Sequence, residues 1–170
     1  MNLGISDAFK KLIGSFGRPS QSDQQPDFGM VTIPNSEPAL VAAIEQARNT
    51  LPYCLERLAS HPERNTDYLF KVAFPTDRGP EYVWVIPVEI DGDRFKGFLA
   101  HDPMFIRGKR QWSKVSFSRD QIIDWGFREG EVSYGQFTTR AIAKIGPGLS
   151  AEFTDGLSET PLPSDAQVRL

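Results

Sequence analysis

The sequence predicts an α+β domain in which N-terminal helices precede a curled antiparallel sheet. Before position 60, apolar residues recur at the three- and four-residue spacing of helices. From Asp67 onward the spacing becomes two, and β-branched and aromatic residues dominate, which is typical of strands. A chain of 170 residues, 39% of them hydrophobic, is long enough to bury one core. Short, closely spaced strands can also close into a small SH3-like barrel.

The first 29 residues are predicted to form an arm and a linker outside this domain. Helical spacing of apolar residues predicts an amphipathic helical arm over 1–17. Residues 18–29 contain two prolines and little to bury, which is typical of a flexible linker. The arm can dock on the domain, dock on a partner, or lie on a membrane surface through Lys10 and Lys11.

A single domain over residues 30–147 is expected to begin with helices. Pro38 marks a helix start, because the first turn of a helix does not need the N–H that proline lacks. Pro52 is expected to interrupt this helix. Thr50 would then cap a second short helix that buries Cys54.

The strand-like segments come next. Asp91-Gly92 predicts a tight hairpin turn, residues 128–131 predict a second turn, and Pro87 indicates an edge or a bulge. Residues 148–170 are polar, acidic and without periodicity, so we expect a disordered acidic tail. The predicted strands are Tyr68 to Phe74, Glu81 to Ile90, Arg94 to Ala100, Trp112 to Phe117 and Glu131 to Phe137.

Short motifs are spread along the domain in a fixed order. They are Glu81-x-x-Trp84-Val85, Asp91-Gly92, Phe95-x-Gly97-x-Leu99, Asp102-Pro103, Ile122-Ile123-Asp124-Trp125 and Gly135-x-Phe137-Thr138-x-Arg140. Over about residues 39–142 this series resembles a family of small bacterial proteins catalogued as a domain of unknown function. The resemblance implies no reaction, cofactor or catalytic residue. We interpret seven motif residues as structural: Trp84, Gly97, Asp102, Pro103, Asp124, Trp125 and Arg140.

The two motif tryptophans have two interpretations. They can be core residues, with the Asp124 carboxylate accepting a hydrogen bond from an indole N–H, or they can line an aromatic groove for a peptide. Trp112 follows a basic loop and is expected to be the most exposed of the three tryptophans.

Two groups of side chains invite a catalytic or metal-binding interpretation. His101 beside Asp102, with Cys54 as a nucleophile, would suggest a hydrolase, but adjacent strand residues face opposite sides of a sheet. Three alternating acids near a hairpin tip lack the spacing of a calcium loop and fit a solvated turn. We therefore expect no catalytic residue, cofactor or metal. The three acids are Glu89, Asp91 and Asp93.

The segment from Arg94 to Arg119 contains seven cations and a single acid, interleaved with aromatic residues, in a chain of formal charge −3. Such a segment can be a solvated face, can meet an acidic protein surface, or can bind single-stranded nucleic acid. The cations are Arg94, Lys96, Arg107, Lys109, Arg110, Lys114 and Arg119. The candidate partner-binding residues are Arg107, Lys109, Arg110, Trp112 and Lys114.

These observations predict a non-catalytic binding protein. A single cysteine and the lack of a long apolar run favour a cytoplasmic protein without a membrane span. The first hypothesis is an immunity-type or regulatory protein that masks a protein partner such as a toxin. The alternative is a small barrel that binds single-stranded nucleic acid through residues 94–119, and an unrecognised hydrolase is a third hypothesis.

Overall fold

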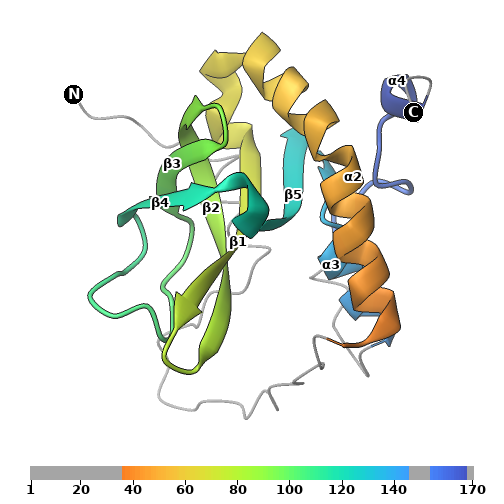
Figure 1. Cartoon of the computed structure of the whole chain (residues 1–170). Helices are drawn as coiled ribbons and strands as arrows, with labels where there is room; N and C mark the ends of the chain where they lie inside the picture. Colours follow the sequence, from red (N-terminus) through yellow and green to blue (C-terminus); the bar gives the residue numbers. More distant parts are fainter. Residues whose placement is uncertain (1–35, 146–153, 168–170) are drawn as a thin grey trace, which may run out of the picture.

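The computed structural model describes residues 36–145 and 154–167, so the predicted arm (1–17) and linker (18–29) lie outside the described residues. A long helix, α2 (Pro38–Ser60), packs across one face of a six-stranded antiparallel sheet (Figure 1). The α+β class is confirmed. The strands are β1 (Tyr68–Thr76), β2 (Gly79–Asp91), β3 (Arg94–Leu99), β4 (Lys114–Ser118), β5 (Ile122–Glu129) and β6 (Val132–Gly135). Shorter helices are η1 (Pro62–Asp67), η2 (Arg119–Gln121), α3 (Phe137–Ile145) and α4 (Ser164–Gln167).

The sheet is open rather than closed into a barrel. Its strand order is β4-β3-β2-β1-β5-β6, so β4 and β6 form the two edges and do not pair with each other. The barrel suggested by the short strand spacing is therefore not formed by the described residues. The open sheet leaves two edges whose backbone groups need partners or water.

Helix α2 continues through Pro52, contrary to the predicted interruption. The Thr50 hydroxyl does not cap a second helix but donates to the carbonyl of Gln46 in the preceding turn (2.7 Å). The carbonyl of Ala47, in that same turn, accepts a hydrogen bond from the indole N–H of Trp125 (2.9 Å). The helix persists because it packs on the sheet on both sides of the proline. Its buried residues are Leu40, Ala43, Ala47, Thr50, Leu51, Cys54 and Leu58.

The predicted strands before residue 120 are confirmed, with ends shifted by a few residues. Asp91-Gly92 forms the β2–β3 hairpin, with Gly92 at φ 57°. Pro87 lies in an interior strand, at a shift of the β2–β3 register, so it marks a bulge rather than an edge.

Strand β5 and helix α3 were not predicted. Strand β5 pairs with both β1 and β6, and Gly130 (φ 58°) lies in the predicted turn that joins β5 to β6. Helix α3 begins at Phe137, where the last strand was expected to end. The prediction was wrong there because Phe and Thr favour strands, whereas the signal that begins α3 comes from β5, as described below.

Apolar side chains fill both faces of the sheet. Cys54 on α2 is fully buried, and aromatic residues from β1, β3, β4 and β5 form the main core beneath that helix. Trp125 stacks on Phe127 with 5.9 Å between ring centroids. A smaller cluster lies on the opposite face and consists of Leu69, Trp84, Ile86 and Ala100.

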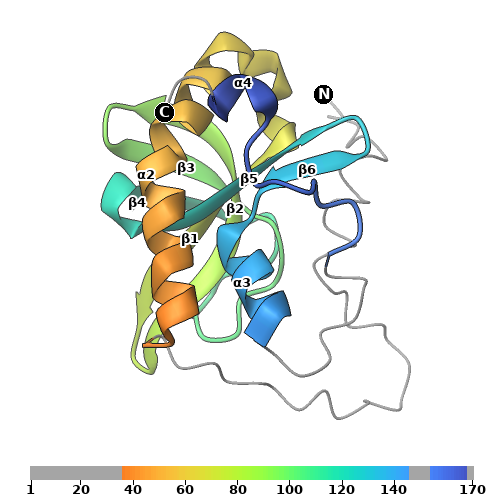
Figure 2. The ribbon, with the colours of Figure 1, turned by 90° about the vertical axis from the view of Figure 1, so that its right-hand side faces the viewer.

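Residues 154–167 pack on the domain, which corrects the expected disordered tail for this part of 148–170. Ser133 in β6 donates to the carbonyl of Gly156 (2.7 Å) and accepts from the N–H of Ser158 (3.0 Å). The N–H of Gly135 donates to the carbonyl of Pro161 (2.7 Å). This segment therefore covers the outer edge of β6, and it runs beside that strand toward α4 (Figure 2).

A chain that stops after residue 153 is expected to be less stable than the full chain by about 2–4 kcal/mol, because three backbone hydrogen bonds are lost at about 1 kcal/mol each. Urea unfolding followed by tryptophan fluorescence would measure the difference. An unchanged midpoint would show that residues 154–167 contribute nothing to the fold.

Candidate functional site

Asp124 is buried in β5 and holds the start of α3. Its Oδ1 accepts hydrogen bonds from the backbone N–H groups of Trp125 (2.8 Å) and Phe137 (3.1 Å). Its Oδ2 accepts from the N–H (2.8 Å) and the hydroxyl (2.6 Å) of Thr138. Phe137 and Thr138 are the first residues of α3, whose N–H groups have no partner within the helix. The carboxylate therefore caps α3 from a neighbouring strand, and it does not bind an indole N–H as the sequence suggested.

Lys71 lies opposite Asp124 in the β1–β5 register. Its Nζ donates to the hydroxyl of Thr138 (3.2 Å) and lies 5.5 Å from the ring centroid of Trp84. Burial lowers the pKa of Lys71, and the charge of Asp124 opposes that shift. Burial raises the pKa of Asp124, opposed mainly by the hydrogen bond from Thr138. The ammonium group thus serves as the counter-charge of a buried capping carboxylate.

Two other motif acids fix the loop between β3 and β4. Glu81 accepts hydrogen bonds from the backbone N–H groups of Met104 and Phe105, the latter at 2.9 Å. Asp102 accepts from the N–H of Gln111 across the same loop (2.8 Å). The carboxylate of Asp102 thus holds the loop backbone. The loop is therefore held at both ends by carboxylates.

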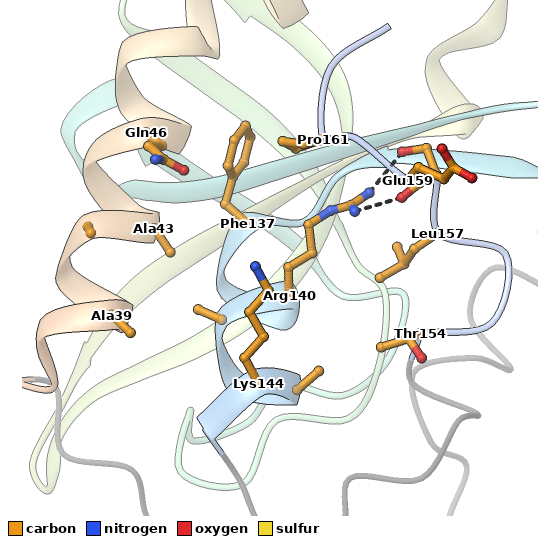
Figure 3. A pocket seen from close by; sticks show the side chains of 14 residues that line it. Ala39, Ala43, Gln46, Phe137, Arg140, Lys144, Thr154, Leu157, Glu159 and Pro161 are labelled. Carbon is orange, nitrogen blue, oxygen red and sulfur yellow. Dashed lines mark hydrogen bonds between the residues drawn. The ribbon is translucent and has the colours of Figure 1, made fainter.

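Arg140, a residue of α3, binds the C-terminal segment 154–167 to the rest of the domain. Its guanidinium donates to the carbonyl of Gly135 (2.7 Å) and to the carbonyl and hydroxyl of Ser158 (2.8 and 2.9 Å). Burial lowers its pKa, and the negative charge of Asp124 opposes that shift. The side chain lies at a pocket of about 600 Å³ between α2, α3 and residues 154–161 (Figure 3). Alanines of α2, together with Phe137 and Ala141, line much of this pocket, and Lys144 is the exposed cation there.

The residues considered for catalysis do not form a nucleophile and base. His101 Nε2 accepts a hydrogen bond from the N–H of Trp84 (3.3 Å), and its Nδ1 lies 3.1 Å from the carbonyl oxygen of Asp102. Cys54 lies on the buried face of α2, where burial raises the pKa of its thiol well above the usual value. A nucleophilic cysteine needs the opposite shift.

Two of the three acids of the β2–β3 hairpin, Glu89 and Asp93, form ion pairs with cations. Glu89 accepts from Lys96 (2.8 Å), which lowers the pKa of Glu89, and Asp93 lies 3.8 Å from Arg119. Within 36–145 and 154–167, no three His, Cys, Asp or Glu side chains gather as metal ligands do. In those same ranges, no helix is both long enough and apolar enough to span a membrane.

Folding divides the basic segment into paired and unpaired cations. Arg107 forms an ion pair with Asp77, in addition to the two hairpin pairs. Three cations in or next to the loop between β3 and β4 have no carboxylate within 4 Å among the described residues: Lys109, Arg110 and Lys114. Together with Arg107 and Trp112 they are called the loop patch.

Trp112 lies within the loop patch and is 41% exposed, whereas Trp84 is 5% and Trp125 0% exposed. The expected ranking of the three tryptophans is confirmed. The backbone of Trp112 has φ 69°, a left-handed conformation that is unfavourable for a bulky residue. Its N–H donates to the carbonyl of Leu99 (2.9 Å), which anchors this conformation to β3.

Comparison with known families gives one match. A bacterial family described as "Uncharacterized protein conserved in bacteria (DUF2314)" matches residues 37–154, more than half of the chain. The chain belongs to the DUF2314 family. The resemblance inferred from the motifs is therefore confirmed. Neither the curated proteins nor the solved structures contain a match.

The DUF2314 match covers every strand of the sheet, α2 and α3, and therefore both the buried cluster and the loop patch. It ends where the segment that covers β6 begins. Sequence reasoning missed Lys71 as a member of the buried cluster. The available signal was a single lysine inside an otherwise apolar, β-branched and aromatic strand, since a buried lysine requires a partner.

Proposed function

We propose that this DUF2314 protein is a non-catalytic binding protein whose loop patch docks on an acidic surface of a protein partner. The observation that carries the proposal is the fixed loop between β3 and β4. Carboxylates bind its backbone at both ends, yet it presents an exposed tryptophan among cations that have no acidic partner in the described residues. Exposed aromatic and arginine side chains on a rigid support are typical anchors of protein interfaces.

The strained backbone supports a binding role for Trp112. A left-handed conformation at a non-glycine residue costs on the order of 1–2 kcal/mol. Such strain concentrates at functional positions, where the surrounding structure maintains it. Here the residue held in this conformation is the exposed tryptophan of the loop patch.

A protein partner is favoured over single-stranded nucleic acid by the ion pairs. Of the seven cations in the basic segment, Lys96, Arg107 and Arg119 are paired with acids from neighbouring turns. The remaining local charge is modest, and the chain carries a formal charge of −3, which works against a polyanion. The specific role that we propose is masking of a toxin or an enzyme in the cytoplasm, as an immunity-type or regulatory protein.

The test compares the wild-type chain with a triple variant, Arg107→Ser, Lys109→Ser and Arg110→Ser. Each protein is immobilised on a resin and incubated with a bacterial lysate. We expect the wild type to retain a defined protein partner that the triple variant releases, with melting temperatures unchanged. Lys144→Ser, which removes an exposed cation on α3, is the control and should retain the partner. Equal retention by the wild type and the triple variant would contradict the proposal.

A titration with a fluorescent single-stranded oligonucleotide tests the alternative. The wild type should bind negligibly at both ~50 and ~200 mM salt, the range in which phosphate contacts change affinity strongly. Tight, salt-sensitive binding that the triple variant loses would replace the protein partner with nucleic acid.

Trp112→Gly is expected to leave the free energy of unfolding within about 1 kcal/mol of the wild type, because relief of the left-handed strain offsets the entropy cost of glycine. The same change should abolish capture of the partner. Chemical denaturation and the capture assay measure the two effects separately. A variant that still captures the partner would remove Trp112 from the interface.

A further inference from the structure

The two edges of the sheet differ in whether another described segment covers them. Residues 154–161 cover β6 through hydrogen bonds to Ser133 and Gly135. No described segment pairs with the outer side of β4, which lies at the opposite edge (Figure 1). An uncovered edge strand is a template on which another extended chain can add by backbone hydrogen bonding.

The phase of the β3–β4 ladder determines which backbone groups face outward. The N–H of Leu99 donates to the carbonyl of Ser113, and the N–H of Arg119 donates to the carbonyl of Asp93. In an antiparallel pair, residues that exchange both hydrogen bonds alternate with residues that face away. Val115 and Phe117 therefore pair inward, whereas the backbones of residues 114, 116 and 118 point away from the sheet.

Side chains satisfy the two ends of this edge but leave its centre open. The Nζ of Lys109 donates to the carbonyl of Lys114 (3.1 Å), and the Oε1 of Gln121 accepts from the N–H of Ser118 (2.9 Å). Ser116 lies between them, is exposed, and has neither its N–H nor its carbonyl bonded to any described residue. The open part of the edge is short, and it is centred on Ser116.

The surroundings of this edge indicate the chemistry of an added strand. A hollow of about 450 Å³ beside Ser116 and Ser118 can receive a side chain of an added strand, and its lining carries both cations, Arg94 and Lys96, and acids, Glu89 and Asp91. At the N-terminal end of β4, Lys114 adjoins Lys109, whose Nζ donates to the Lys114 carbonyl, and neither cation has a carboxylate within 4 Å among the described residues. An incoming segment is therefore expected to carry acidic residues at the end that faces Lys114.

We propose that β4 accepts an extended, acidic segment of the protein partner as a seventh strand. This inference rests on the proposed function, because the same partner would contact the loop patch. A second copy of this chain is a poorer occupant. Antiparallel self-pairing about Ser116 would place Lys114 of one copy opposite Ser118 of the other, which offers Lys114 no acidic partner.

The test uses a random dodecapeptide library displayed on phage and selected on the full chain. Enriched peptides should be extended and acidic, and should bind wild type and Ser116→Ala equally. Ser116→Pro removes the outward N–H without removing a hydrogen bond to β3, so this variant should fold and bind the peptides at least about tenfold more weakly. Hydrogen exchange should show peptide-dependent protection of the Ser116 amide, while the Ser118 amide, already bonded to Gln121, changes little.

The outcomes separate this inference from the proposed function. Peptides that Ser116→Pro binds as tightly as wild type, or a selection without enrichment, would overturn the β4 proposal. Peptides that bind Ser116→Pro normally but no longer bind the triple variant would keep the loop patch as a binding site and overturn the β4 proposal. Peptides that bind the triple variant normally but no longer bind Ser116→Pro would support the β4 proposal and show that the loop patch does not contribute to their binding. A wild-type dimer in sedimentation that Ser116→Pro converts to monomer would assign the edge to a second copy and overturn the proposal.

Discussion

Replacing Asp124 with alanine is expected to lower the free energy of unfolding by about 3–5 kcal/mol. The change leaves the N–H groups of Phe137 and Thr138 without their acceptor at the start of α3. It also removes the negative charge that compensates Lys71, which remains buried beside it. Urea unfolding monitored by circular dichroism would measure the loss.

Two further variants give this prediction its controls. Asp124→Asn keeps the size of the side chain but only one of its two acceptor oxygens. Its free energy of unfolding should therefore lie between those of the wild type and Asp124→Ala. Asp102→Ala removes a single hydrogen bond, from the exposed N–H of Gln111, and should cost a small fraction of the Asp124→Ala value. Equal losses at Asp102 and Asp124 would contradict the capping role of Asp124.

Gly135→Ala is expected to cost at least about 3 kcal/mol, because it combines backbone strain with a clash. Gly135 has φ 74°, a conformation that favours glycine, and an added Cβ would lie 2.3 Å from the carbonyl oxygen of Trp125. The indole ring is also too close, at 2.7 Å. Because both contacts belong to the buried Trp125, neither can move without disturbing the core.

Gly130→Ala is the matched control for this variant. Gly130 has φ 58°, but nothing lies within 4 Å of an added Cβ there. Only the conformational strain remains, so the cost should be about 1–2 kcal/mol. If the two variants melted alike, the close approach of Gly135 to Trp125 would not be a constraint on the fold.

The first half of the sheet could be predicted from the sequence because its signals are local. Asp91-Gly92 specifies a hairpin turn, and alternation along β3 and β4 places Phe95, Val115 and Phe117 inward. The bulge at Pro87 follows equally from a local property, the missing N–H of proline.

The second half of the sheet, α3 and the C-terminal segment could not be predicted from the sequence, because the residues that stabilise each of them lie in other elements. Residues of β5 are buried on both faces, so no alternation marks the strand. The capping group of α3 is a carboxylate on β5, and the helix through Pro52 is held by packing on both sides of the proline. Residues 154–167 have no periodicity because they are held by backbone bonds to β6.

The sequence predicted which residues the candidate site contains, but not which of them form an accessible surface. The sequence identifies seven cations around residues 94–119, yet only folding brings Asp77 to Arg107 and Asp93 to Arg119. The left-handed backbone of Trp112 has no local signal either, since tryptophan is not a residue that favours it.

Docking on the loop patch can be tested directly by the association rate of the captured partner with the wild type and with the triple variant, at ~50 and ~200 mM salt. Complementary charges mainly accelerate association, and salt screens them. We expect wild-type association to slow as salt rises, and the triple variant to associate about tenfold more slowly at low salt with little salt dependence. Equal rates for the two proteins at both salt concentrations would contradict a partner docked on the loop patch.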